Sequence, residues 1–132
     1  MHVETTLRNC EALFRQYDVD IAYLFGSYAT GTEHDESDVD VAIVLADPDS
    51  GHDRVPELER RLSRRLETPV DCRVVNDGDP RFVYTILRTG WPVYVADDDK
   101  RREFEHRTMR AYLDMKPFYD EYDRYVKDRL TA

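Results

Sequence analysis

Apolar and polar residues follow one another along this chain in segments that predict alternating helices and strands. Near the start, apolar side chains recur at helical spacing and predict one helix from about residue 3 to 17. Beyond it, short apolar runs of strand length alternate with segments of helical spacing. The predicted elements are a strand at 21–25, a strand at 38–45, a helix at 53–67, a strand at 70–75, a helix at 81–88 and a strand at 91–95.

The last part of the chain, from about 97 to 132, is predicted to be helical. Pro117 has no N–H to donate, so it should break or kink this helix near Lys116. A stripe of apolar side chains follows at alternating steps of three and four, made of Tyr112, Met115, Tyr119, Tyr122 and Val126. Two interpretations stay open: the stripe packs on the domain's own sheet, or its tyrosine-rich distal part contacts a partner, since aromatic residues are enriched in interface cores.

These elements predict an α/β (α+β) protein, with a small mixed β-sheet covered by helices and a C-terminal helix. A length of 132 residues suits one domain with a modest core, so we expect residues 1–132 to form a single domain. Pro92 cannot donate to a sheet ladder and predicts that the last strand lies at an edge.

Composition narrows the class of protein. The chain has 19 Lys and Arg against 28 Asp and Glu, a net charge of −9, so we expect no direct nucleic-acid binding, which needs clustered cations. It has no apolar run of membrane-spanning length and no basic-then-apolar leader. We therefore expect a cytoplasmic protein that does not enter a membrane. Cys10 and Cys72 are expected to be small buried apolar groups.

The candidate chemistry lies between the first and third strands. Gly26 and Ser27 follow an apolar run, and a helix beginning at Ser27 would offer free N–H groups to a phosphate. Asp38 and Asp40 would share one face of the second strand, roughly 7 Å apart at their Cα atoms. Two such carboxylates favour a cation between them, and Mg²⁺ prefers these ligands. Asp71, on the third strand, either joins them or is an edge-strand carboxylate that faces water.

Together these residues resemble a family signature. The segment from Gly26 to Asp40 is similar to the Gly-Ser-x10-Asp-x-Asp motif of the DNA polymerase beta-like nucleotidyltransferase superfamily, because ten residues separate Ser27 from Asp38. Ser37-Asp38-Val39-Asp40 matches the Ser-Asp-hydrophobic-Asp of the motif. Within the superfamily the chain most resembles the minimal nucleotidyltransferases (MNT type, MntA-like), which are the antitoxins of HEPN/MNT toxin–antitoxin systems.

The resemblance implies a fold, an activity and a partner. It implies the polymerase beta-like fold, with Asp38, Asp40 and Asp71 as catalytic residues and as ligands of two Mg²⁺ ions, and with Gly26 and Ser27 as nucleotide-binding residues. ATP would be the substrate of a Mg²⁺-dependent protein adenylyltransferase. That enzyme would transfer AMP to a tyrosine of a HEPN ribonuclease toxin, neutralise it and form a hetero-oligomer with it.

Two alternatives stay open beside this function. One is an antitoxin that binds its toxin without catalysis, and the other is a nucleotidyltransferase for small molecules, a class that normally has an extra helical domain. The chain also departs from its relatives at Thr30, where they often carry the arginine of Gly-Ser-x-Ala-Arg-Gly. A cation for the triphosphate is missing at that position, and Arg73 is a candidate substitute.

Overall fold

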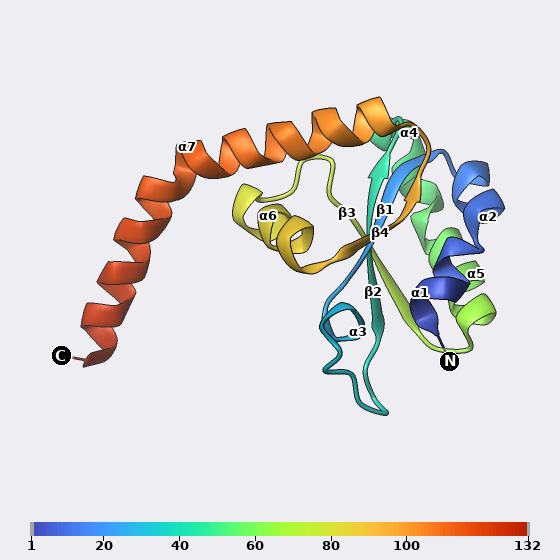
Figure 1. The fold of residues 1–132 in the computed structure, drawn as a ribbon, viewed down its shortest axis with the longest axis horizontal. Helices are drawn as coiled ribbons and strands as arrows, with labels where there is room; N and C mark the ends of the chain where they lie inside the picture. Colours follow the sequence, from blue (N-terminus) through green and yellow to red (C-terminus); the bar gives the residue numbers. More distant parts are fainter. Residues whose placement is uncertain (1, 132) are drawn as a thin grey trace.

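The structure is a computed structural model that describes residues 2–131 (Figure 1). Ala132, the last residue of the predicted C-terminal helix, lies outside this range. The elements are α1 (Val3–Arg8), α2 (Glu11–Gln16), β1 (Val19–Phe25), α3 (Ser27–Thr30), β2 (Val39–Leu45), α4 (Pro48–Gly51), η1 (His52–Arg54), α5 (Val55–Leu66), β3 (Val70–Val74), α6 (Pro80–Thr89), β4 (Trp91–Val95) and α7 (Asp98–Thr131).

The four strands form one mixed sheet in the order β3-β2-β1-β4. β1 runs antiparallel to both β2 and β4, whereas β2 and β3 are parallel. A parallel pair requires a crossover connection, and α5 supplies it between β2 and β3. β4 lies at an edge of the sheet, which confirms the prediction made from Pro92.

Helices cover the two faces of the sheet unequally (Figure 1). Side chains that include Leu24, Val41 and Ile43 point to one face, where they form the larger core with α1, α2 and α5. Ile21 and Val44 point to the other face and pack against α6 and the first part of α7. This second face carries an apolar cluster at the end nearer α7, and the polar residues described below lie at its other end.

Two helical segments differ from the sequence prediction. The helix expected over 3–17 is two short helices, because the chain turns at Asn9 and Cys10. The turn allows Leu7 in α1 and Phe14 in α2 both to be fully buried against the same core. After β2, a segment in which neither helix nor strand was predicted contains α4, whose first turn is capped by the Asp47 side chain accepting from the Asp49 N–H.

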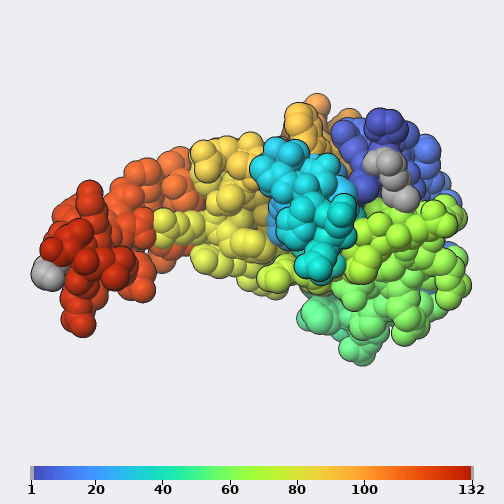
Figure 2. Space-filling view, turned by 90° about the horizontal axis from the view of Figure 1, so that it is seen from below, coloured from blue at the N-terminus to red at the C-terminus, as the bar shows by residue number. Residues whose placement is uncertain are grey.

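The C-terminal helix α7 is continuous through Pro117 and bends instead of ending there. Its first half lies on the sheet, where Phe104 is buried and the Tyr23 hydroxyl donates to Glu105 at 2.8 Å. About halfway along, the helix changes direction and its second half leaves the body of the protein (Figure 1). Figure 2 shows this end standing apart from the remaining elements.

Two tyrosines of the α7 stripe, Tyr112 and Tyr119, contact α6 and its N-terminal cap and not the sheet. Tyr112 stacks on Tyr84 with ring centroids 3.9 Å apart. The Tyr119 hydroxyl donates to Asp79 at 3.0 Å, and Arg81 donates twice to Asp123, at 3.0 and 2.6 Å. These contacts tie the bend to the start of α6, so the partner-contact interpretation is left with the exposed side chains of this half, which include Phe118 and Tyr122.

The structure bears on the predictions made for the two cysteines and for membrane-spanning segments. Cys10 is buried, as predicted, and Cys72 is partly buried; both are free thiols. Among residues 2–131, no helix combines the length and the apolar character needed to cross a membrane.

Candidate active site

The corner after β1 requires glycine for two reasons. Gly26 has φ 76° and ψ −155°, a backbone conformation that is essentially restricted to glycine. A Cβ atom built on Gly26 would also overlap the Asp40 carboxylate oxygen Oδ2. The one-turn helix α3 then begins at Ser27, so the condition on which free N–H groups were expected there is met. The predicted glycine corner therefore exists, and its backbone lies directly against a predicted catalytic carboxylate.

The strand register brings the predicted carboxylates together. Asp40 in β2 pairs with Phe25 in β1 on one side and with Asp71 in β3 on the other. Neighbouring strands lie roughly 4.8 Å apart, so Asp40 and Asp71 are immediate neighbours. Asp71 therefore lies beside Asp40, although it is also on an edge strand and its side chain is 43% exposed.

Asp38 lies just before β2, which corrects the prediction that the strand opens with it. The chain enters the sheet at Val39, whose N–H donates to the Pro69 carbonyl at 2.9 Å. Asp38 is therefore an exposed residue of the connection that leads into the strand.

The charges of these residues act on one another. Burial raises the pKa of the Asp40 carboxyl above its ordinary value. The Asp71 carboxylate raises it further and Asp38 adds a smaller increase, whereas the Arg73 cation lowers it. Three carboxylates and one arginine therefore share an electrostatic environment in which a cation would stabilise ionised Asp40.

Arg73 lies beside the carboxylates on the same face of the sheet, two residues after Asp71. Its Nε donates to Asp71 Oδ2 at 3.4 Å. Its guanidinium carbon lies 5.9 Å from the centre of the Phe82 ring, which in turn meets Phe25 edge-on at 5.8 Å. The two phenylalanines thus separate the apolar part of this face from the polar part.

The side chains fit Mg²⁺ in their chemistry but are not arranged as a finished metal site. Three carboxylates are the hard oxygen ligands that Mg²⁺ prefers. Burial first, and then the Asp71 carboxylate, raise the pKa of Asp40, and a divalent ion would offset both effects by stabilising the ionised form. Within residues 2–131, however, no three His, Cys, Asp or Glu side chains converge as ligands of one ion. Asp71 is paired with Arg73 instead.

Neighbouring elements hold the strands and the corner in place. Ser63 and Glu59 of α5 accept hydrogen bonds from the backbone N–H groups of Val70 and Cys72 in β3, at 2.9 and 2.8 Å. Trp91 Nε1 donates to the carbonyl of Ala29 in α3 at 3.1 Å. Sequence reasoning did not identify these contacts, because nothing in the pattern of the chain shows which distant residues meet.

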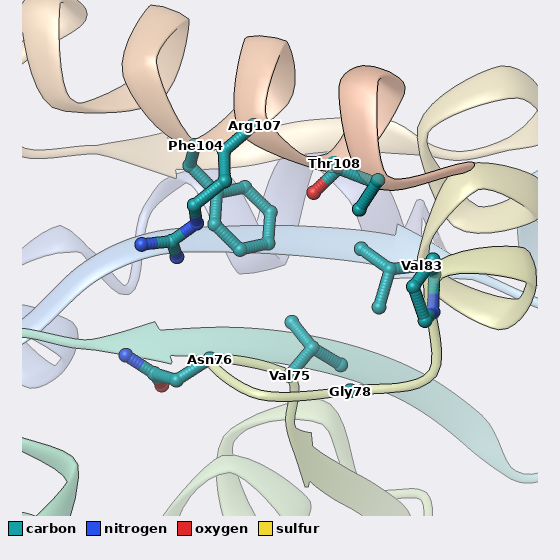
Figure 3. A pocket seen from close by; sticks show the side chains of 9 residues that line it. Val75, Asn76, Gly78, Val83, Phe104, Arg107 and Thr108 are labelled. Carbon is teal, nitrogen blue, oxygen red and sulfur yellow. The ribbon is translucent and has the colours of Figure 1, made fainter. Parts of the chain in front are cut away.

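The candidate site is distinct from the cavity beneath α7. That cavity has a volume of about 160 Å³ and is lined by residues that include Val75, Val83, Phe104 and Thr108 (Figure 3). Its lining contains none of the predicted site residues. It lies within the apolar part of the face and is separate from the carboxylates.

Known proteins are similar to this chain in sequence and in fold. The protein adenylyltransferase MntA of Shewanella oneidensis is 42% identical over 92 residues, which are 70% of this chain and 65% of that protein. A crystal structure of a toxin–antitoxin with AMP-PNP has a TM-score of 0.68 at 23% identity and covers 98% of both chains. A structure of a tri-AMPylated Shewanella oneidensis HEPN toxin with its MNT antitoxin also has a TM-score of 0.68, at 20% identity, and covers both chains fully. At these identities the two structural likenesses establish the fold.

A family description covers the part of the chain that contains the site. The family "Polymerase beta, Nucleotidyltransferase" matches residues 8–99, which run from the end of α1 to the start of α7 and include the Gly26 corner and all three carboxylates. The sheet topology, the glycine corner and this match together lead to one assignment: the chain belongs to the polymerase beta nucleotidyltransferase family.

Proposed function

We propose that this chain is a Mg²⁺-dependent protein adenylyltransferase that transfers AMP from ATP to a tyrosine of a HEPN toxin and acts as its antitoxin. Residues 1–132 would form a single nucleotidyltransferase domain, and the reaction would take place in the cytoplasm. The observation that carries the proposal is the register that puts Asp40 beside Asp71 and against Gly26. The 42% identity to MntA supports the choice of reaction within the family.

The proposal divides the site residues into metal ligands and phosphate-binding residues. Asp38, Asp40 and Asp71 would hold Mg²⁺, which would neutralise charge on the transferring phosphate when bound. Gly26 and Ser27 would contact the β- and γ-phosphates, because the glycine backbone permits a close approach.

The transfer itself is an in-line displacement. The tyrosine hydroxyl oxygen attacks the α-phosphorus, the bond from that phosphorus to the bridging oxygen breaks, and pyrophosphate leaves. In this proposal Asp71 would orient the attacking hydroxyl and accept its proton. AMP is then joined to the tyrosine through a phosphodiester bond.

The distal half of α7 offers the surface on which the toxin would dock. Phe118 is 63% exposed and Tyr122 is 64% exposed, and large apolar side chains exposed together mark interaction sites. Tyr122 and Leu130 also line a groove along this end of the helix. The matching chains of the two solved structures described above cover 98% and 100% of this chain, so the likeness extends over most of α7.

A mass measurement tests the catalytic proposal. The protein is incubated with ATP, Mg²⁺ and a HEPN toxin, and the toxin is weighed. We expect a gain of one or more AMP units that is lost in the double variant Asp38→Asn with Asp40→Asn. The absence of any mass gain with the unaltered protein would refute catalysis.

The alternative that a specific observation favours is an antitoxin that only binds its toxin. The carboxylates are not preassembled around one point, and Thr30 stands where relatives often carry an arginine. Under this alternative the double aspartate variant would still neutralise the toxin, with no change in toxin mass.

The docking surface is tested separately from the chemistry. Phe118→Asp combined with Tyr122→Asp is expected to abolish co-purification with the toxin, because two carboxylates would replace apolar contacts. Met109→Asp is the matched control, an exposed apolar residue in the first half of the same helix. Equal loss of the complex in the control would contradict a role specific to the distal half.

A further inference from the structure

A triphosphate that enters this site meets an excess of negative charge. Asp40 pairs with Asp71 across neighbouring strands, Asp38 lies two residues before Asp40, and the phosphates of ATP add several further charges. Magnesium ions offset part of this repulsion, and enzymes that bind triphosphates commonly add Lys or Arg side chains. A cation that belongs to the protein would offset the remaining repulsion.

The glycine corner does not supply that cation. Thr30 occupies the position at which relatives often carry arginine, and its hydroxyl lies 3.3 Å from the Gly26 carbonyl and 3.4 Å from the Ser27 carbonyl. This side chain is thus turned back onto its own short helix. A cation for the phosphates has to come from another element.

Arg73 is the cation whose charge reaches the carboxylates. It follows Asp71 by two residues on β3, so the two side chains lie on the same face of the sheet. It donates to Asp71 and is steadied by the ring of Phe82, while its side chain remains 58% exposed. The guanidinium is therefore held at the site and is open to a ligand.

We propose that Arg73 is the triphosphate-binding cation of this site, which pairs with Asp71 in the absence of nucleotide and with phosphate oxygens when nucleotide binds. The inference rests on the proposed function, because it assigns a ligand to one residue of that site. The exchange releases Asp71 to act toward the metal and the acceptor hydroxyl. It also gives this chain the charge that Thr30 lacks.

The present pairing of Arg73 is weak enough to be exchanged. Its contact with Asp71 runs through Nε alone at 3.4 Å, and both side chains are substantially exposed. Exposed pairs of this kind contribute little to stability. Phosphate, in contrast, suits the planar guanidinium, which binds it through two parallel hydrogen bonds.

Binding of AMP-PNP and of AMP to the full chain with Mg²⁺, measured by calorimetry, tests the proposal without relying on turnover. Arg73→Gln is expected to weaken AMP-PNP binding by about 10- to 100-fold, as for the loss of a charged hydrogen bond. AMP lacks the β- and γ-phosphates, so its affinity should change much less. Arg64→Gln is the matched control, because Arg64 is an exposed residue of α5 on the opposite side of the sheet.

Two further variants distinguish a charge role from a structural one. Arg73→Lys keeps the charge at the same position, and Thr30→Arg in the Arg73→Gln background moves it to the position that relatives use. Each is expected to restore part of the AMP-PNP affinity. Failure of both to restore any would show that Arg73 acts through the structure of β3, and the proposal would be wrong.

Other outcomes separate this inference from the proposed function. Unchanged AMP-PNP affinity in Arg73→Gln, with normal binding by the unaltered protein, would overturn the inference and leave the function standing. Equal weakening of AMP and AMP-PNP would also overturn it, because the contact would not be to the outer phosphates. If the unaltered protein with Mg²⁺ binds no AMP-PNP, the proposed function fails and takes the inference with it.

Discussion

Substitution of Gly26 by alanine tests the packing on which the site depends. The Gly26 backbone lies at φ 76° and ψ −155°, where a residue with a Cβ is strained by about 1–3 kcal/mol. The new methyl group would also overlap Asp40 Oδ2, so the Asp40 side chain or the corner must move. We expect Gly26→Ala to destabilise the fold by at least the backbone strain and to displace the Asp40 carboxylate, for which we propose a catalytic role.

The expected effect on activity is larger than the effect on stability. A displacement of a catalytic group by about 1 Å can lower a rate by ~100-fold. Transfer of AMP to the toxin, followed by mass, should therefore fall by about that factor or more, while urea unfolding shows a protein that is weakened but still folded.

Gly31→Ala is the matched control for backbone strain. Gly31 also has a positive φ, of 75°, yet a Cβ atom placed on it meets nothing within 4 Å. Left-handed backbone costs an alanine about 1–2 kcal/mol, so both variants should lose stability. Only Gly26→Ala should lose activity, because only Gly26 lies against Asp40.

A double-mutant cycle with Asp40→Ala isolates the contact. Removing the carboxylate should reduce the stability cost of Gly26→Ala, with a coupling of about 0.5–3 kcal/mol, as for residues in direct contact. Strictly additive free energies of unfolding, or full AMP transfer by Gly26→Ala, would refute the reasoning.

Three further outcomes are expected. Asp40→Asn should raise the free energy of unfolding at pH 7, because the raised pKa of Asp40 means that folding disfavours its ionised form. In urea titrations this gain in the free energy of unfolding should be full above the raised pKa. It should shrink as the pH falls toward 3.8, the ordinary pKa of an aspartate. Mg²⁺ should raise the melting temperature of the unaltered protein but not that of Asp40→Asn, since an ion that binds only the folded state stabilises it. Asp123→Asn should speed hydrogen exchange in the distal half of α7 with little change in melting temperature, because the bond to Arg81 is exposed.

The sequence was sufficient to predict most elements and the motif, because these depend on local patterns. The four strands, the corner at Gly26 and the edge position of β4 follow from apolar runs, a glycine and Pro92. The prediction of a single helix over 3–17 was wrong, because the apolar periodicity continues across the turn at Asn9. It does so since the two short helices on either side of the turn bury apolar residues in one core.

Contacts between distant residues could not be predicted in the same way. Arg73, Phe82 and Phe25 meet only because β3, α6 and β1 converge on one face. The periodicity of α7 likewise does not reveal that Tyr112 stacks on Tyr84 of α6 and not on the sheet. Such contacts depend on the tertiary arrangement, and local propensity carries no information on it.

The mixed topology of the sheet explains why one residue, Asp40, connects all parts of the site. Antiparallel pairing with β1 brings the end of that strand, and so Gly26, to the start of β2. Parallel pairing with β3 brings Asp71 to the same place, since two parallel neighbours begin at the same end of the sheet. If both neighbours of β2 were antiparallel to it, Asp71 would lie at the far end of β2. If both were parallel, Gly26 would lie there instead.

The register of β3 is as important as its direction. Side chains alternate between faces, so a slip by one residue would place Val70 or Cys72 beside Asp40 and turn Asp71 into the opposite core. Ser63 and Glu59 oppose such a slip, because they accept hydrogen bonds from alternate N–H groups along the outer edge of β3. The crossover helix α5 therefore has two roles. It returns the chain to the end of the sheet at which β2 begins, and its hydrogen bonds hold β3 in the register that pairs Asp71 with Asp40.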